Sequence, residues 1–536
     1  MTALIILSVI ILFTFAYRFY GAFLQKRWGV DPSRPTPAHT LRDDRDYVPT
    51  PMPVLFGHHF ASIAGAAPII GPIAASAFGW MPVLLWIVVA GVFIGSVHDF
   101  GALFASVRHQ AKPLSRVIDE HIGATNRGLF SGFVWLTSLL VIAAFTSIVA
   151  DSFVAMPSAG TASALFMLLA VAFGYVRRRL PISLTVATLI FLLLMAGCIR
   201  LGLLLPLVLA KNTWMLLIIV YIAVASVTPV WVLLQPRDYL NSFLLFALIA
   251  LAALGLLIVN PPIEMAAFTG FRAENMTLFP LLFVMVACGA ISGYHAMFAS
   301  TTTSKQVNNE RDLRPVAMGG MLVESLLAVL ALLIAATLTR ARFGELYHNG
   351  GPIAIFSSGI AALTTKFHVP TEISASFVVL AISSFALTSL DSVARVARSI
   401  VQEIAHKNET IAALHLTPTL RSPFGATLVT VALGGAAAFS PWQKIWPIFG
   451  CANQLIAALT LVTLYVWLKK TGRIYGVLVL PMIFMLVVAA SGLAQLSTTS
   501  IRTHSHLLAA VALMLLGLAT AFVAVIIKMS ATRKTV

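Results

Sequence analysis

Apolar runs about as long as a bilayer is thick recur along the whole chain, with short polar loops between them. A helix needs about 20 mostly apolar residues to cross the hydrocarbon core of a membrane. Hydrophobic residues make up 59% of the 536 residues and charged ones only 10%, too few to cover a soluble protein of this size. The sequence therefore predicts an all-α polytopic membrane protein with about fifteen transmembrane helices. The predicted spans are 3–22, 57–79, 80–107, 128–151, 158–176, 183–205, 213–234, 241–259, 277–303, 315–338, 371–394, 424–440, 446–468, 474–495 and 506–529.

Most of the 35 Lys and Arg residues fall in every second loop between these runs. Because basic loops stay on the cytoplasmic side, this alternation predicts an N-terminus outside the cell and a C-terminus inside. A net charge of +16 would by itself suit a nucleic acid partner, but the position of the basic residues in loops on one side indicates orientation in a lipid bilayer, so no nucleic acid partner is expected. The first apolar run is followed, not preceded, by the basic pair Lys26 and Arg27, so we expect a retained helix rather than a cleaved signal peptide.

Motifs of several other protein classes are absent from the sequence. No stretch matches the nucleotide-binding pattern GxxxxGK[ST], so transport driven by ATP hydrolysis on this chain is not expected. Neither HExxH nor GxSxG occurs, which disfavours a membrane-embedded enzyme, and no cofactor is expected. Cys198, Cys288 and Cys451 lie in apolar runs without metal-ligand spacing. A passive channel remains an alternative to a carrier, although channel filters usually come from symmetric subunits.

The run 57–79 contains residues that break helices in its middle. Each Pro removes a backbone donor and clashes with the preceding turn, and lipid cannot satisfy the backbone groups that are set free. We therefore expect a discontinuous helix whose open backbone faces a sheltered cavity, as at the substrate sites of many secondary transporters. The alternative is a Pro-kinked packing helix. The predicted substrate-binding residues here are Gly65, Ala66, Ala67, Pro68 and Gly71.

Two further runs are interrupted in a similar way. In 213–234 the sequence Ser-Val-Thr-Pro occupies 226–229, and in 277–303 two glycines flank polar residues at 288–295. Open backbone and hydroxyl groups at membrane depth suit substrate contact. The predicted substrate-binding residues in these two breaks are Ser226, Thr228, Gly289, Ser292 and Tyr294.

The five spans of 57–205 and the five of 213–394 enter the membrane from opposite sides, and each set opens with an interrupted run. This order predicts an inverted repeat of five plus five helices. The predicted division of the chain is an N-terminal helix and loop (1–56), a transport core (57–394), and a loop with further helices (395–536).

Ionisable residues inside a membrane are costly and suggest function. His58 and His59 open the first broken run, where they either accept protons and gate or simply lie at the interface. Asp99 either pairs with a loop arginine such as Arg108 or relays protons. Arg237 and Asp238 form either a structural ion pair or part of an inner gate.

The second half of the chain adds more candidates for coupling and gating. His295 lies in the third break, and Glu324 lies at membrane depth without a neighbouring Lys or Arg in sequence. Glu324 is thus either a proton carrier or a neutral structural residue. Asp391 is expected to pair with Arg395 and Arg398.

Two other groups of polar residues have simpler alternatives. The hydroxyls of Ser300 and Thr301 suit a Na⁺ site, unless they bond helix carbonyls. Asn453 and Gln454 are expected to bond a neighbouring helix.

Seven motifs together resemble the carbon starvation protein A family and extend over almost the whole chain. They are HHFASIAGAAPIIGP (58–72), GSVHDFGALF (95–104), TPVWVLLQPRDYLNSF (228–243), CGAISGYHAMFASTTTSKQ (288–306), RPVAMGGMLVES (314–325), TSLDSVARVAR (388–398) and WPIFGCANQLIAAL (446–459). The family more often has Gly where Ala67 stands and Gln where His98 stands. The resemblance implies a bacterial inner-membrane transporter made under nutrient limitation, with a LeuT/APC-like inverted-repeat core plus peripheral helices. It also implies uptake of peptides or pyruvate with proton coupling. In a bacterial inner membrane, the outside N-terminus expected from the basic loops lies in the periplasm.

The residues and the resemblance together predict a secondary active transporter for a small organic solute, a peptide or pyruvate, coupled to H⁺ or Na⁺. Half-helix N-termini at the breaks would face the substrate carboxylate. The oligomeric state is not specified by the sequence.

Overall fold

The computed structural model describes residues 1–44, 46–229, 232–273, 276–407 and 417–532, and these are almost entirely helical. The one sheet in this part of the chain is a two-residue hairpin, in which β1 (Arg272–Ala273) pairs antiparallel with β2 (Met276–Thr277). Helix starts follow local sequence: the hydroxyls of Ser183 and Ser422 accept hydrogen bonds from the first turns that they cap. An all-α fold is therefore confirmed.

Eleven helical segments of the described residues are long and apolar enough to cross a membrane. The chain is a multi-pass membrane protein. These segments comprise α1 (Thr2–Phe15), η1 (Ala16–Tyr20) and α2 (Gly21–Trp28) as one; α6 (Trp80–Ala90), η3 (Gly91–Gly95) and α7 (Ser96–Arg108) as one; α9 (Ala124–Ala155); α10 (Pro157–Arg179); α11 (Leu184–Leu204); α13 (Leu234–Val259); η6 (Glu310–Asp312), η7 (Arg314–Gly319) and α16 (Gly320–Ala336) as one; α18 (Thr371–Lys407); α22 (Trp442–Lys470); α23 (Gly476–Arg502); and α24 (His506–Thr532).

Four of the fifteen predicted spans take other forms. The run 57–79 lies in a bent pair, α4 (Met52–Ile63) and α5 (Ala67–Ala75), the latter continued by η2 (Ser76–Phe78). The run 277–303 is divided into η4 (Leu278–Leu282), α14 (Phe283–Met285) and α15 (Gly293–Thr301). The runs 213–234 and 424–440 form the shorter helices α12 (Lys211–Val227) and α21 (Pro423–Ala438). The total of about fifteen spans thus remains a prediction.

The interruption predicted inside 213–234 is wrong in one respect. Helix α12 ends at Val227, and Pro236, Arg237 and Asp238 belong to the first turns of the next helix, α13. Pro236 fits there because the first turn of a helix has no intrahelical partner for the missing N–H. This region is thus a connection between two helices, and residues 230–231 lie outside the described part.

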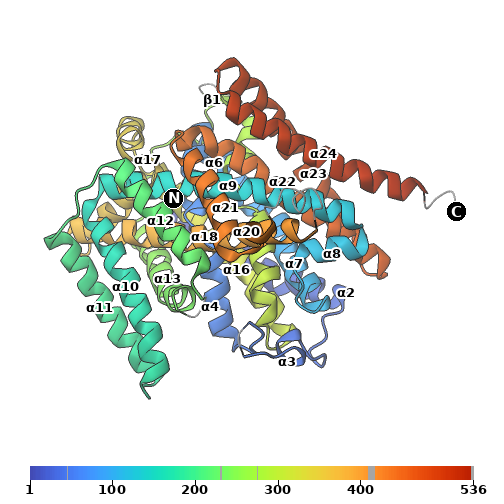
Figure 1. Ribbon diagram of the computed structural model, residues 1–536. Helices are drawn as coiled ribbons and strands as arrows, with labels where there is room; N and C mark the ends of the chain where they lie inside the picture. The colour runs from blue at the N-terminus through green and yellow to red at the C-terminus, as the bar shows by residue number, and fades with distance from the viewer. Residues whose placement is uncertain (45, 230–231, 274–275, 408–416, 533–536) are drawn as a thin grey trace.

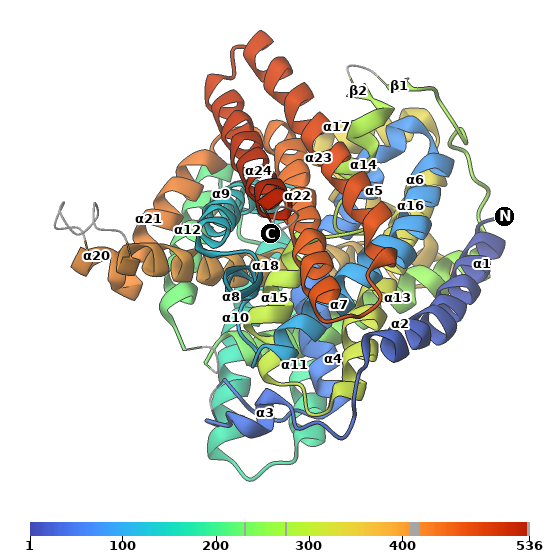
Figure 2. The same cartoon turned by 90° about the vertical axis from the view of Figure 1, so that its right-hand side faces the viewer.

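Three long helices form the centre of the molecule. About nine-tenths of the apolar windows of α9, α18 and α22 are buried: 89%, 89% and 94% respectively. By contrast, the hairpins α10–α11 and α23–α24 lie at opposite edges in both ribbon views (Figures 1 and 2). Only 39% of the window of α11 and 22% of that of α24 is buried. Exposed Leu and Ile side chains on these outer helices suit contact with lipid.

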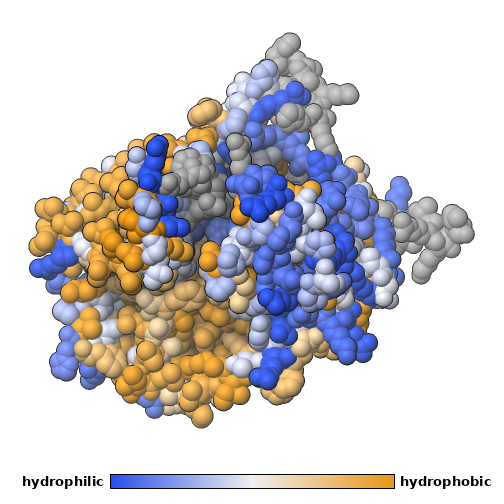
Figure 3. Space-filling model, turned by 90° about the horizontal axis from the view of Figure 1, so that it is seen from below, coloured by the Kyte–Doolittle hydropathy of each residue, from blue (hydrophilic) through white to orange (hydrophobic). Residues whose placement is uncertain are grey.

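The surface is also divided into a hydrophobic part and a hydrophilic part. Seen from below, hydrophobic residues cover most of the left part and hydrophilic residues most of the right part (Figure 3). The right is the side on which α2, α7 and α8 (Leu114–His121) are labelled in Figure 1.

Loops that were predicted to share one side of the membrane do meet in space. Arg108 bonds the carbonyl oxygen of Gly29 and the carboxylate of Glu310, each at 2.7 Å, and Lys470 bonds the carbonyl oxygen of His121. We call this the basic end of the molecule. At the other end Thr2 bonds Asn260, and backbone hydrogen bonds join residues 264–267 to Trp80, Met81 and Ala336.

Candidate functional site

Two broken segments cross in the core of the molecule. Helices α4 and α5 are bent by 45° about residues 64–66, and the second segment loses helical structure between α14 and α15. Helix α4 packs against α15 and α5 packs against α14, so the two segments run in opposite directions. The predicted breaks in 57–79 and in 277–303 are therefore confirmed.

Glycine is required where these segments approach each other and the neighbouring helices α16 and α18. A Cβ atom on Gly71 would lie 2.5 Å from the carbonyl oxygen of Met285, and one on Gly289 would lie 2.5 Å from Cβ of Ala328. Gly65 is similarly close to Ser389, with 2.6 Å from the hypothetical Cβ to the Ser389 hydroxyl. No other residue type fits these contacts without a shift of backbone or neighbour.

Asn453 of α22 satisfies the backbone of the second break. Its side-chain oxygen accepts from the backbone N–H of Tyr294 at 3.1 Å, and its amide nitrogen lies 3.2 Å from the hydroxyl of Ser292. Gln454 donates to the carbonyl of Phe283. The prediction that this pair bonds a neighbouring helix is confirmed, and it adds α22, outside the expected core 57–394, to the site.

A chain of buried ionisable groups lies beside the second break. Asp99 accepts a hydrogen bond on each carboxylate oxygen, from Nδ1 of His98 at 2.7 Å and from Nδ1 of His295 at 2.8 Å. The other ring nitrogen of His295, Nε2, lies 3.2 Å from a carboxylate oxygen of Glu324. All four side chains are at most 1% exposed.

The expected pairing of Asp99 with Arg108 is wrong. Arg108 lies at the end of α7 and bonds Glu310, whereas Asp99 faces the interior from the first turn of that helix. Glu324 is fully buried on α16, and neither of its oxygens has a hydrogen-bond partner among the described residues. Asp99, His295 and Glu324 thus link α7, α15 and α16 through groups that can exchange protons.

A cavity of about 30 Å³ lies between the two breaks. Its lining includes Gly65, Ala67, Ser292, Tyr294 and His295. This volume suits one or two water molecules, whereas ligand pockets usually measure about 300–1,000 Å³. The space between the two breaks is therefore too small for a substrate as it stands.

A larger cavity of about 360 Å³, which we call the vestibule, lies at the end opposite the basic end. Residues of α5, α9, α12, α17 (Arg340–Thr365) and α22 line it, among them Asp151 and Lys211, whose charged groups lie 2.8 Å apart. Phe145, beside the small cavity, contacts Trp446 and Phe449 with ring centroids 6.0 and 6.2 Å apart. Helix α17 changes direction at Gly351, whose φ of 66° is unfavourable for other residues.

Several predicted gating residues form a second buried cluster. Asp391 of α18 pairs with Arg237 of α13 at 2.5 Å, and Asp238 lies 3.5 Å from the same guanidinium and 3.9 Å from His58. The predicted partners of Asp391 are thus wrong. Arg395 and Arg398 instead donate to backbone carbonyls at the end of α12, those of Thr228 and Ser226.

Other predicted residues lie apart from the cavity between the breaks. Ser226 bonds Thr427 of α21 at 3.1 Å, so Ser226 and Thr228 do not line that cavity. His59 bonds Thr303 at 2.9 Å. Ser300 and Thr301 both donate to the carbonyl of Met297, the helix-bonding alternative to a Na⁺ site.

Sequence reasoning missed three residues at or beside the cavity. Ser389 and Phe145 line the cavity although neither stands out in its apolar run. Ser138 of α9 bonds the hydroxyl of Tyr294 at 2.9 Å. A hydroxyl in an apolar run without a break is a weak sign of a functional contact, because most such hydroxyls bond a carbonyl of their own helix.

The family model of the carbon starvation protein CstA matches residues 1–348 and 341–492. The chain is 33% identical over 506 residues to the peptide transporter CstA of Bacillus subtilis (strain 168), a match that covers 85% of this chain and 84% of that protein. It is 29% identical over 587 residues to the pyruvate/proton symporter BtsT of Escherichia coli (strain K12), which covers 92% of this chain and 82% of the symporter.

Among solved structures, the fold is similar to the crystal structure of a manganese transporter from Eremococcus coleocola. The TM-score is 0.54 at 11% sequence identity, and the match covers 91% of this chain and 99% of the transporter. At this identity the likeness concerns the fold alone.

Proposed function

The chain belongs to the carbon starvation protein CstA family, and from this premise we propose that it takes up a peptide or pyruvate by proton symport. Its named relatives are transporters rather than enzymes. Uptake would proceed across a bacterial inner membrane under carbon limitation, with the N-terminus in the periplasm and the C-terminus in the cytoplasm.

The observation that carries the proposal is the contact of His295 with both Asp99 and Glu324, at 2.8 and 3.2 Å. Ionisable groups at membrane depth are costly unless they serve a purpose, and chains of Asp, Glu and His are the usual proton relays of transporters. His295 also lines the cavity between the two breaks. Gain or loss of a proton by His295 therefore changes the charge directly beside the position that we assign to the substrate.

Helix ends at the cavity suit a carboxylate. Ala67 begins α5 and Ser292 precedes α15, and both residues line the cavity. The helix dipole attracts negative charge to such N-termini, as do those of their N–H groups that are not already bonded; the N–H of Tyr294 is bonded to Asn453. Pyruvate and peptides share a carboxylate, so this contact serves either substrate.

The small size of this cavity favours a carrier over a passive channel. Phe145 and Phe449 line the small cavity and contact Trp446, whose ring in turn contacts Trp442 of the vestibule. Such a barrier between an outer cavity and a central site suits alternating access by a carrier.

We propose further that the core is an inverted repeat of five plus five helices. Its second half opens at Leu278 rather than at residue 213, since the second broken segment begins there and runs opposite to α4 and α5.

Uptake by the purified chain in liposomes tests this function. Labelled pyruvate and a labelled dipeptide are offered separately under an imposed H⁺ gradient, a Na⁺ gradient, or neither. We expect accumulation of one of the two only with the H⁺ gradient, and exchange with unlabelled substrate in counterflow. Accumulation that follows Na⁺ alone contradicts proton coupling, and flux without counterflow contradicts a carrier.

A further inference from the structure

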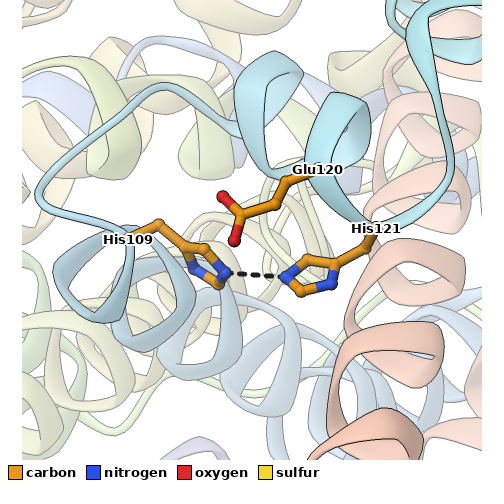
Figure 4. Close-up of side chains that lie close together, drawn as sticks. All are labelled: His109, Glu120 and His121. Atoms are coloured by element: carbon orange, nitrogen blue, oxygen red, sulfur yellow. Dashed lines mark hydrogen bonds between the residues drawn. The ribbon is translucent and has the colours of Figure 1, made fainter.

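Two histidines and a glutamate meet at the basic end, away from the transport site. The Nε2 atoms of His109 and His121 lie 2.8 Å apart, and the carboxylate of Glu120 points toward both rings (Figure 4). One ligand atom from each of the three residues lies within 4.8 Å of the others. We propose that these three side chains bind a divalent transition-metal ion such as Zn²⁺.

The backbone around His109 brings the three residues together. His109 follows the last residue of α7, and Gln110 and Ala111 both adopt positive φ, 59° and 54°. Two consecutive left-handed residues reverse the chain sharply, so that α8 returns past the end of α7. Glu120 and His121 then form the last turn of α8 and face His109.

The hydrogen bond of His109 prepares it as a ligand. Its Nδ1 lies 2.6 Å from the carbonyl oxygen of Ala105, and because a carbonyl only accepts, Nδ1 carries the proton. Nε2 therefore presents a lone pair toward His121. A backbone carbonyl in this position is the usual partner of a metal-binding histidine, since it fixes the tautomer and the ring orientation.

The ring of His109 is also held by packing. It meets the indole of Trp467 edge to face, with centroids 5.3 Å apart. Lys470, one turn further along α22, donates to the carbonyl oxygen of His121 at 2.7 Å. The lysine ammonium thus contacts the backbone of α8 at this corner.

The donor set selects the class of ion. Two imidazole nitrogens and one carboxylate suit Zn²⁺, Cu²⁺ or Ni²⁺, whereas Mg²⁺ and Ca²⁺ prefer oxygen ligands. Zn–N distances of about 2.05 Å in tetrahedral geometry require the two nitrogens to stand about 3.3 Å apart. The rings therefore separate by roughly 0.5 Å on binding. His121 then holds its proton on Nδ1, and water completes the coordination.

Bound metal would join the end of α7 to the end of α8 by direct bonds. This inference does not rest on the proposed transport activity, because binding and thermal stability report it without any substrate.

Zinc binding to the full-length chain in detergent tests the site, with a purification tag that contains no histidine and prior treatment with EDTA. Competition with a chromophoric chelator gives the stoichiometry and the Kd. We expect one tightly bound Zn²⁺ per chain and a higher Tm in its presence. The variants H109Q and H121Q should weaken binding on the order of 100-fold, and E120Q about 10-fold.

A matched control uses His504 and His506, a second pair of nearby histidine rings with centroids 6.0 Å apart. The variants H504Q and H506Q should leave Zn²⁺ affinity unchanged. Glu120 is exposed, so E120Q tests the site even where a histidine variant folds poorly. Absence of tight binding by the wild-type chain, or equal affinity in H109Q, H121Q and E120Q, overturns the proposal.

Discussion

Nδ1 of His295 lies 2.8 Å from a carboxylate oxygen of Asp99, and this contact joins the second broken segment to the helix that follows the first. Asp99 is also bonded by His98, so both of its oxygens are engaged. The second nitrogen of His295 faces Glu324, whose oxygens have no hydrogen-bond partner among the described residues. Of the two carboxylates, Glu324 is thus the less constrained one and the better candidate to gain and lose a proton.

The variant Glu324→Gln should uncouple uptake from the proton gradient. The amide keeps the size of the side chain but cannot titrate, so the proton step is lost while binding at the helix ends remains. We expect gradient-driven accumulation to fall at least about tenfold, equivalent to about 1.4 kcal/mol, with counterflow exchange retained. Uptake in proteoliposomes measures both. Normal dependence on the gradient in this variant would refute the role of Glu324.

Gly293 should not tolerate a side chain. A Cβ atom there would lie 2.4 Å from the carbonyl oxygen of Asn453 and 2.4 Å from Cβ of Ile456, both on the deeply buried α22. We expect Gly293→Ala to destabilise the fold by about 1–3 kcal/mol through overpacking and to lower transport. Thermal unfolding in detergent and uptake give the two readouts.

Gly128→Ala is the matched control for that variant. Gly128 lies in α9, and a Cβ atom there would meet nothing within 4 Å. Since alanine is favoured over glycine inside a helix, stability should stay equal or rise by up to about 1 kcal/mol. If both glycine variants change stability and transport to the same extent, close packing at the second break does not explain the need for glycine at position 293.

The buried pair Arg237–Asp391 should matter more to stability than ion pairs at the surface. Both side chains are at most 1% exposed and their closest atoms lie 2.5 Å apart. Arg237→Ala leaves the buried carboxylates of Asp391 and Asp238 without their guanidinium, which should cost about 3–5 kcal/mol. The exposed pair Arg342–Glu345 offers a control, because Arg342→Ala should cost about 0–1 kcal/mol. Equal shifts in Tm would contradict this ranking.

The sequence predicts the breaks at 57–79 and 277–303 because Pro and Gly act on their own turn of helix. Residues 226–229 carry a similar signal, yet there it marks only the end of α12. A local pattern does not distinguish a break within a span from a connection between spans, since the difference depends on where the next helix packs.

Partners of the ionisable residues were harder to predict than the residues themselves. Asp99 and Asp391 stand out in sequence as charged groups in apolar runs, but proximity in sequence suggested Arg108 and Arg395 as partners. The structure pairs them with His295 and Arg237, which are distant along the chain. Such contacts depend on helix packing, and spacing in the sequence carries no information about it.

Lys211 should keep the vestibule accessible to an anionic substrate by neutralising Asp151. Its ammonium lies 2.8 Å from Asp151 at the edge of the 360 Å³ cavity, 40% exposed. Because Lys211 neutralises Asp151 in this lining, Lys211→Gln leaves an unpaired carboxylate that repels an anionic solute. The variant should therefore lower kcat/KM about two- to fivefold, most strongly at low salt. Proton dependence should stay unchanged. Arg502→Gln, which removes a charge that does not line this cavity, is the control, and an equal loss there would show a nonspecific effect.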